Sequence, residues 1–346
     1  MSDHPPWDGR FIGEDANLDR IDRQIVHCLQ RDGRAAFRLI AGAVGVSEQT
    51  IARRYRAMSD AGVFRVLVLP DPRHVSGENW LLRVAPRPDA TERLAAVLAE
   101  RSDVSWVSIT GGGSETTCVH RPDPLSPTAV ALLRQLQRTA QVGSFGAYKM
   151  LHMRLGGDAE WLAFDDPLSE EQVAILEEAR EATEKSAASG GGFGLHADDA
   201  QLLAELERDG RASAVTLSGR LGLSRPRVSA RLSELFGTGL LHTEVDVDAS
   251  LLGFDSAAYL WLTVAPSRLK ETGDAVAAHR ECGFAAAVTG TANLVAAVNC
   301  RSDEALYEYV TTKVGLLPAV TGVEIVPVLT RYKQASTRMR RGHLPP

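Results

Sequence analysis

Apolar residues recur at helical spacing near the start of the chain. Leu18, Ile21, Ile25 and Leu29 lie three or four positions apart, and this spacing predicts a helix with one buried face. A short second helix is expected to end near Val44, and a third helix follows it. Three short helices in this order are typical of a helix-turn-helix module.

Glycine and serine mark the ends of these helices. Gly33 interrupts the first helical pattern, and we expect it to adopt the left-handed conformation that often closes a helix. Gly45 is expected to make the turn after the second helix. Ser47 is placed to cap the third helix, where its hydroxyl can accept a hydrogen bond from a free backbone N–H.

A second pattern, in which strands alternate with helices, follows the three helices. The predicted strands are residues 79–84, 104–110, 115–120 and 147–153, and the predicted helices are residues 91–100 and 126–137. Read in order, they form a βαββαβ unit, which is the ferredoxin-like topology.

The whole arrangement occurs twice. The phrase RDGR at residues 31–34 returns at residues 208–211, 177 positions later. Around it, apolar positions align with apolar positions, for example Ile51 with Val228, and a second βαββαβ order follows at 258–330. The chain is therefore a tandem duplication. We expect its glycine Gly210 to close a helix as Gly33 does, and the RDGR arginines to contact DNA phosphate rather than bases.

These patterns predict the α+β class, with two winged, three-helix helix-turn-helix domains that are each followed by a ferredoxin-like βαββαβ domain. The expected boundaries are 15–68 for the first helix-turn-helix domain, 76–156 for the first ferredoxin-like domain, 157–194 for an acidic helical and Gly-rich linker, 195–246 and 254–334 for the second pair of domains, and 335–346 for a basic tail.

Composition narrows the class of protein. The net charge is −6, but the acidic residues concentrate in 158–194, while 18–65 carries nine Arg against five Asp and Glu. A basic surface therefore remains available to nucleic acid. No apolar run is long enough to span a bilayer, no secretory signal is recognisable, and the four cysteines are widely spaced. We expect a cytoplasmic protein with no metal and no cofactor.

The third helix of copy one is a candidate recognition helix. With Ile51 buried, the opposite face carries Gln49, Arg53 and Arg56, and such side chains can pair with the edges of adenine and guanine. The alternative is an ordinary solvated, charged helix face. The candidate DNA-contacting residues here are Ser47, Gln49, Thr50, Arg53, Arg54 and Arg56.

The matching helix of copy two is different. With Val228 buried, its opposite face carries Pro226, Ala230 and Ser233, none of which is a cation. Its arginines lie on the flanks, where they suit phosphates better than bases. We therefore expect copy one to read the sequence and copy two to position the backbone. The candidate contacts of copy two are Ser224, Arg225, Arg227 and Arg231.

The chain resembles the Lrp/AsnC family of prokaryotic transcription regulators. The stretches that carry the resemblance are LDRIDRQIVHCLQRDGRAAF and GVSEQTIARRYRAMSDAGVFR in copy one, and RDGRASAVTLSGRLGLSRPRVSARLSELFGTGLL in copy two. The resemblance implies binding to double-stranded DNA, assembly through the βαββαβ module, and often an amino acid or another small effector. The family usually has one copy per chain, so a fused pair implies either a homo-oligomer or an internal pseudo-dimer.

The resemblance also marks a turn near the effector site, which in the family reads TG-x-x-D. The matching stretches here are TGGGSE and TGTANL, and neither has the Asp. The alternative is a pair of ordinary turns between strands. The candidate effector-binding residues are Thr110, Gly111, Glu115, Thr289, Gly290 and Asn293.

Other functions stay open at this point. Fused pairs of such modules also resemble sirohaem decarboxylases, in which histidines matter, but His120, His152 and His242 are not repeated between the copies. A ligand sensor that does not bind DNA is a further alternative. The linker is expected to be a solubilising charged helix followed by a flexible joint, and the basic tail either follows DNA or is a solvated end.

Overall fold

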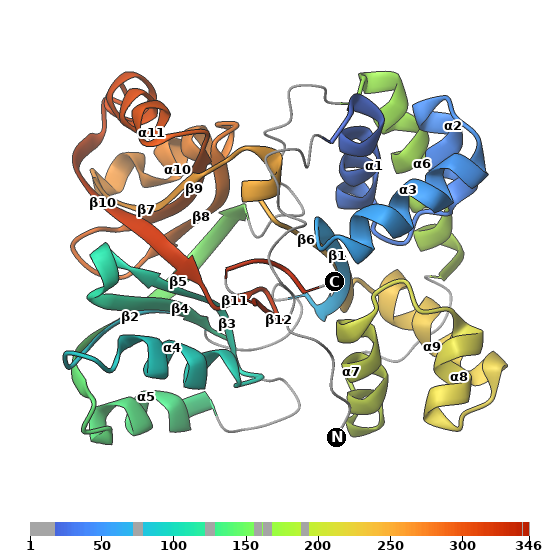
Figure 1. Cartoon of the computed structure of the whole chain (residues 1–346), viewed down its shortest axis with the longest axis horizontal. Helices are drawn as coiled ribbons and strands as arrows, with labels where there is room; N and C mark the ends of the chain where they lie inside the picture. The colour runs from blue at the N-terminus through green and yellow to red at the C-terminus, as the bar shows by residue number, and fades with distance from the viewer. Residues whose placement is uncertain are drawn as a thin grey trace.

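The computed structural model describes residues 18–71, 79–121, 129–155, 161, 168–187, 194–340 and 342–345. The helical modules lie on one side of the molecule and the strand-rich modules on the other (Figure 1). Residues 15–17 and, within the expected linker 157–194, residues 157–160, 162–167 and 188–193 lie outside the described residues.

Local signals in the sequence set the helix ends of copy one. The first helix starts with reciprocal bonds: Asp22 N donates to the Asp19 carboxylate at 2.9 Å, and Asp19 N donates to the Asp22 carboxylate at 3.3 Å. Gly45 closes the second helix in the left-handed region at φ 81°. Ser47 Oγ accepts from Thr50 N at 3.1 Å and caps the third helix. The helices are α1 (Arg20–Arg31), α2 (Phe37–Val44) and α3 (Glu48–Asp60).

Copy two repeats this module with one difference at the last cap. Gly222 again closes the second helix, at φ 66°. Ser224 stands at the cap position, but its side chain makes no capping hydrogen bond, and Pro226 at the second helical position has no N–H to donate. The helices are α7 (Ala200–Arg208), α8 (Ala214–Leu221) and α9 (Arg225–Gly237).

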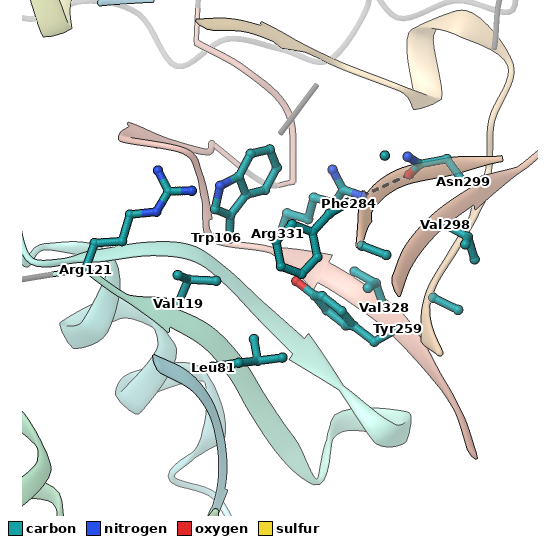
Figure 2. A pocket seen from close by; sticks show the side chains of 13 residues that line it. Leu81, Trp106, Val119, Arg121, Tyr259, Phe284, Val298, Asn299, Val328 and Arg331 are labelled. Carbon is teal, nitrogen blue, oxygen red and sulfur yellow. Dashed lines mark hydrogen bonds between the residues drawn. The ribbon is translucent and has the colours of Figure 1, made fainter. Parts of the chain in front are cut away.

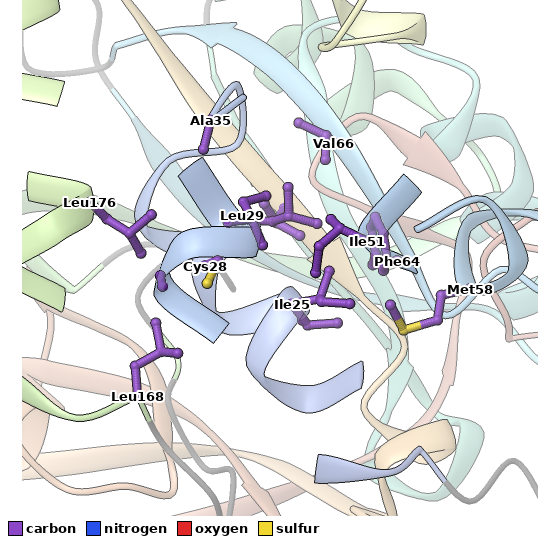
Figure 3. Close-up of a cluster of buried hydrophobic side chains, with 14 of the residues drawn as sticks. Ile25, Cys28, Leu29, Ala35, Ile51, Met58, Phe64, Val66, Leu168 and Leu176 are labelled. Carbon is purple, nitrogen blue, oxygen red and sulfur yellow. The ribbon is translucent and has the colours of Figure 1, made fainter. Parts of the chain in front are cut away.

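The core of the first helix-turn-helix module extends beyond its three helices. Ile25, Leu29 and Ile51 are fully buried within it (Figure 3), as the helical spacing predicted. Leu168 and Leu176, from the expected linker, are buried in the same cluster. Leu176 lies on α6 (Glu170–Ala187) and Leu168 stands just before it, so this helix is a packed part of the module. The prediction of a merely solubilising spacer is wrong for this segment, because its apolar stripe has a helical surface to cover.

A two-stranded sheet joins the two helix-turn-helix modules. One strand comes from each copy, and they pair antiparallel with Val66 opposite Val245. Because backbone hydrogen bonds run along the whole pairing, the two modules form one unit rather than two tethered ones. The strands are β1 (Phe64–Pro70) and β6 (Leu241–Val247).

The strands of the two βαββαβ modules close into one barrel in the order β10-β3-β4-β2-β5-β8-β9-β7. The last strand of each copy is long enough to pair twice. β5 pairs with β2 of its own copy and then with β8 of the other, and β10 pairs with β7 and then with β3. The two modules are thus paired within a single chain. The strands are β2 (Trp80–Pro86), β3 (Val104–Thr110), β4 (Glu115–His120), β5 (Val142–Leu155), β7 (Ser256–Val264), β8 (Cys282–Val288), β9 (Leu294–Cys300) and β10 (Val320–Arg331).

Helices cover the outside of the barrel, and apolar side chains fill its inside. Leu81, Val119, Trp261 and Val295 are buried together in the interior. The predicted α+β class, with two helix-turn-helix modules and two ferredoxin-like modules, is confirmed. The outer helices are α4 (Thr91–Ala99) and α5 (Ala129–Arg138) in copy one, and α10 (Leu269–Ala277) and α11 (Asp303–Tyr309) in copy two.

The basic tail folds back onto the molecule. It forms a small hairpin of β11 (Lys333–Gln334) and β12 (Thr337–Arg338). His343 Nδ1 lies 3.0 Å from the Asp248 carboxylate, and Leu344 is buried. The sequence analysis expected the tail either to contact DNA or to be a solvated end. The described tail residues are instead packed against the protein.

Burial of His27 makes stability depend on pH. His27 lies on α1 with its side chain buried, and its Nδ1 accepts a hydrogen bond from Leu168 N at 3.0 Å. Burial lowers the pKa of His27 to about 4, with a smaller contribution from Arg31. The unfolded chain, with a histidine pKa of about 6.5, then binds more protons than the folded chain between pH 6.5 and 4. The contribution of His27 to the unfolding free energy should be fully present above pH 6.5, and should fall by roughly 1.4 kcal/mol per pH unit between pH 6.5 and 4.

Urea unfolding from pH 7.5 to 4.5 measures this slope. A His27→Gln variant serves as the comparison, because it keeps a polar side chain that does not titrate. His279, whose pKa burial also lowers, remains in both proteins and cancels in the difference. Parallel pH profiles for the two proteins would contradict the assignment to His27.

Candidate nucleic-acid interface

The exposed face of α3 is the one that the sequence predicted. Ile51 and Met58 are buried, while Gln49, Arg53 and Arg56 are exposed. Within the residues that the structure describes, no hydrogen bond or ion pair engages these three side chains. Two guanidinium groups and one amide therefore project from a rigid helix, as direct reading of bases in a major groove requires.

Arg54, in contrast, is held within its own module. Its Nη1 donates to Asp19 Oδ2 at 2.7 Å and to Asp22 Oδ1 at 2.8 Å, and these bonds raise the pKa of Arg54. The arginine ties α3 to the start of α1. Ser47 and Thr50 bond to each other through their hydroxyls at 2.8 Å. These three candidates serve local structure, and their contact with DNA remains a prediction.

The recognition helix of copy two keeps the difference seen in the sequence. Pro226, Ala230 and Ser233 are exposed and offer no cation. Arg225 is exposed, and Arg227 is 66% exposed with its guanidinium 4.0 Å from the Asp198 carboxylate.

Arg231 occupies the same structural position as Arg54. Its Nε and Nη2 form a two-point pair with the Asp199 carboxylate at 2.8 and 2.6 Å, and Nη1 lies 2.7 Å from Glu234. The bonds to Asp199 and Glu234 hold the pKa of Arg231 well above its usual range, and Arg231 lowers the pKa of Asp199. Both copies thus use this arginine as an internal tie between the first and third helices.

The RDGR arginines hold the two modules together. Arg211 of copy two donates to Gly33 O at 2.6 Å and to Ala35 O at 2.8 Å in copy one. Its guanidinium also lies over the rings of Phe37 and Tyr55, at 4.7 and 5.3 Å from their centres. Each arginine therefore reaches across to the loop that carries the other.

The reciprocal contacts come from Arg34. Its two terminal nitrogens donate to Gly210 O and, at 3.2 Å, to Ala212 O. Burial lowers the pKa of Arg34 and of Arg211. The expectation that these RDGR arginines contact phosphate is wrong, because both guanidinium groups are already satisfied by backbone carbonyls of the other copy. We call this arrangement the arginine clasp.

The RDGR glycines have a role that the sequence did not show. Neither Gly33 nor Gly210 has a positive φ, so the prediction of a left-handed helix end is wrong. Instead, Gly210 N donates to Val66 O at 2.9 Å. A Cβ at Gly210 would lie 2.7 Å from the Leu67 carbonyl carbon, and one at Gly33 would lie 2.9 Å from Thr243 Cβ. Because glycine has no side chain, each RDGR loop can bring its backbone close to the β1–β6 strands.

The copy-one effector candidates take part in the structure of the barrel. Thr110 is buried, with its hydroxyl 3.0 Å from that of Thr117. Gly111 adopts a left-handed turn at φ 59°. Glu115 forms a two-point ion pair with Arg83, at 2.9 to 3.1 Å. A ligand at this turn would have to replace existing bonds.

The copy-two candidates are engaged in the same way. Thr289 Oγ1 accepts from Lys149 N at 2.9 Å. Asn293 pairs with the backbone of Val264, accepting at 2.9 Å and donating at 2.8 Å. Gly290 turns at φ 118°. Effector binding at these six residues remains a prediction.

Neither a metal centre nor a membrane span is found among the described residues. No group of three or more His, Cys, Asp and Glu side chains there is arranged to hold an ion. Among the helices that the structure describes, none combines the length and the apolar composition that crossing a bilayer requires.

Breaking the arginine clasp should destabilise the molecule. Arg34→Ala or Arg211→Ala leaves two carbonyls per site without their charged donor, which should cost about 2–4 kcal/mol of unfolding free energy. Arg208→Ala is the matched control from the same motif. The Arg208 side chain is 77% exposed, and its loss should cost less than about 0.5 kcal/mol. Urea denaturation compares the three variants, and equal losses would refute the clasp.

Comparison with known proteins agrees with this architecture. The sequence matches the AsnC-type helix-turn-helix domain at residues 18–59 and 197–235, and the Lrp/AsnC ligand binding domain at residues 257–337. An HTH-type transcriptional regulator of Pyrococcus furiosus, itself uncharacterized, is 31% identical over 100 residues, which are 28% of this chain and 68% of that protein. The regulator FL11 of Pyrococcus abyssi is 43% identical over 49 residues, 14% of this chain and 32% of FL11.

A solved structure matches the two-copy chain as a whole. The siroheme decarboxylase NirDL aligns over 94% of both chains with a TM-score of 0.56 at 15% sequence identity. A likeness at this identity shows a shared fold. The sequence matches and the duplicated modules lead to one conclusion: the chain belongs to the Lrp/AsnC family, as a tandem duplication of the helix-turn-helix and ligand-binding modules.

Proposed function

We propose that the chain is a sequence-specific DNA-binding transcription regulator that acts in the cytoplasm. The observation that carries the proposal is the exposed face of α3, where Gln49, Arg53 and Arg56 have no partner within the described residues. Arginine and glutamine are the side chains that pair with guanine and adenine edges in the major groove. Desolvating them against DNA breaks no internal ion pair.

The two recognition helices divide the work. The face of α9 presents Pro226, Ala230 and Ser233, which have no charge to offer a base. Its exposed arginines, Arg225 and Arg227, lie beside that face and suit phosphate oxygens. Copy one therefore reads sequence, and copy two positions the duplex.

One chain supplies both halves of a DNA-binding pair. The β1–β6 pairing and the arginine clasp fix the two helix-turn-helix modules relative to each other. In proteins of this class, the distance between two recognition helices sets the spacing between half-sites. Two recognition helices held at a fixed distance bind half-sites at one spacing, and here a single chain supplies both helices.

Variants in the two recognition helices test this division. Arg53→Ala should relax sequence preference and cost about 1–3 kcal/mol at the preferred site, because a base contact is lost. Arg227→Ala should weaken binding to all sequences alike and reduce the salt dependence by about 0.9 in log–log slope, because a phosphate contact is lost. Selection from a random duplex library, followed by titration at several salt concentrations, measures both effects.

Arg93→Ala, an exposed arginine on α4 in the barrel, is the control and should change neither quantity. Equal loss of sequence preference in the Arg53 and Arg227 variants would contradict the division of work. No salt-sensitive duplex binding by the intact chain would overturn the regulator and leave a ligand sensor without DNA.

A tetrapyrrole enzyme is the second candidate. The match of fold to siroheme decarboxylase NirDL along 94% of the chain supports it. Incubation of the purified chain with sirohaem distinguishes the two functions. Decarboxylated product, with a shift of the absorption bands on binding, would favour the enzyme; duplex binding with no change in the sirohaem spectrum would favour the regulator.

A further inference from the structure

A cavity opens at one end of the barrel between the two βαββαβ modules. Counted together with the solvent-open space at its mouth, the volume not filled by atoms is about 590 Å³, and strands of both copies line it. Its walls are mostly apolar, with the aromatic rings of Trp106, Tyr259 and Phe284 among them. Figure 2 shows that Arg121 and Arg331 also point into this region. No carboxylate belongs to the lining that the structure describes.

Among the described residues, no acid balances the positive charge that the two arginines bring. Arg331 donates to two neutral amides, Asn299 Oδ1 at 3.0 Å and Gln334 Oε1 at 3.4 Å. For the Arg121 side chain, the described residues provide neither a hydrogen bond nor an ion pair. Apolar walls strengthen the field of such charges, because little water is present to screen them. The cavity therefore attracts an anion.

The strand of copy one that corresponds to β10 has no arginine at the position of Arg331. Arg331 pairs with Ser108 of β3, and the matching pair on the other side of the barrel joins His152 of β5 to Ala287 of β8. The Arg331 guanidinium at the cavity therefore has no counterpart at the matching position of copy one.

The backbone around Trp106 also points to a built site. Trp106 has φ 52°, in the left-handed region that is strained for a bulky residue. It lies where the pairing of β3 with β4 shifts register between Ser105 and Ser108. Bulges of this kind re-aim a side chain, and here the indole becomes part of the cavity wall.

We propose that this cavity binds a small organic acid with an apolar, ring-sized body. The carboxylate pairs with Arg121 and Arg331, and the body packs against Leu81, Val119 and Phe284. The role of the cavity as an effector site rests on the proposed function. Binding of the acid itself does not depend on that function, because it is measured without DNA.

The acid-binding site connects to the strands that hold the DNA-binding modules. Gln334, which accepts from Arg331, donates through Nε2 to Val247 O at 2.9 Å. Val247 is the last residue of β6, opposite Phe64 of β1. A carboxylate that draws the Arg331 guanidinium away from Gln334 would act on the β1–β6 pairing through a single side chain.

Calorimetric titration of the full chain with phenylacetate and benzoate tests the site, with phenylacetamide as the uncharged isostere. At least one acid should bind, and at least tenfold more tightly than the amide, because the charge is the recognised feature. Arg121→Gln and Arg331→Gln should each weaken acid binding about tenfold. Arg93→Gln removes an exposed arginine elsewhere on the barrel and should leave acid binding unchanged.

Arg121→Gln is the decisive variant, because its side chain has no described partner whose loss would disturb the fold. An unchanged urea midpoint confirms that this variant is folded. The proposal is overturned if neither acid binds at millimolar concentration, if acid and amide bind equally, or if both cavity variants bind like Arg93→Gln. Duplex binding by the chain without acid is recorded separately, so that failure of the acid site and failure of the regulator are told apart.

Discussion

The arginine clasp is the constraint on which the rest of the structure depends. Arg34 and Arg211 each place a buried cation against two backbone carbonyls of the other copy. A charge buried in this way is tolerated only when its donors are satisfied, so each copy needs the other to be present and correctly placed. Gly33 and Gly210 lie between these arginines and the β1–β6 strands, where any side chain would collide with the partner strand. The RDGR phrase is thus an interface motif, which explains why it occurs once in each copy.

The same dependence recurs in the barrel. β5 and β10 each begin in their own sheet and finish in the sheet of the other copy, which leaves no unpaired strand edge in the closed barrel. Two interfaces, one helical and one of strands, therefore hold the copies in a single arrangement. Since the fusion guarantees the partner, each copy was free to change where it does not touch the other.

Those changes give the two copies different surfaces. Arg53 on α3 has Ala230 as its counterpart on α9 at the 177-residue offset, so the exposed basic face exists only in copy one. Arg331 of β10 meets only amides at the cavity, and His152 stands at the matching position of β5. The pseudo-symmetric frame thus carries one helix with an exposed basic face and one cationic pocket, and the Gln334 side chain lies between the pocket and β6.

The sequence by itself determined the three helices of each helix-turn-helix module, the βαββαβ order of elements, the duplication and the exposed face of α3, because periodicity, caps and spacing act within a few residues. It named Arg54 and Arg231 as candidate DNA contacts, and the structure showed both to be internal ties to carboxylates 32 residues away. Only the tertiary structure decided the role of RDGR, the packing of α6 and the tail, and the cavity. Each of these depends on contacts between distant segments, such as the 176 residues that separate Arg34 from Gly210, and no local pattern in the chain records which distant surfaces will meet.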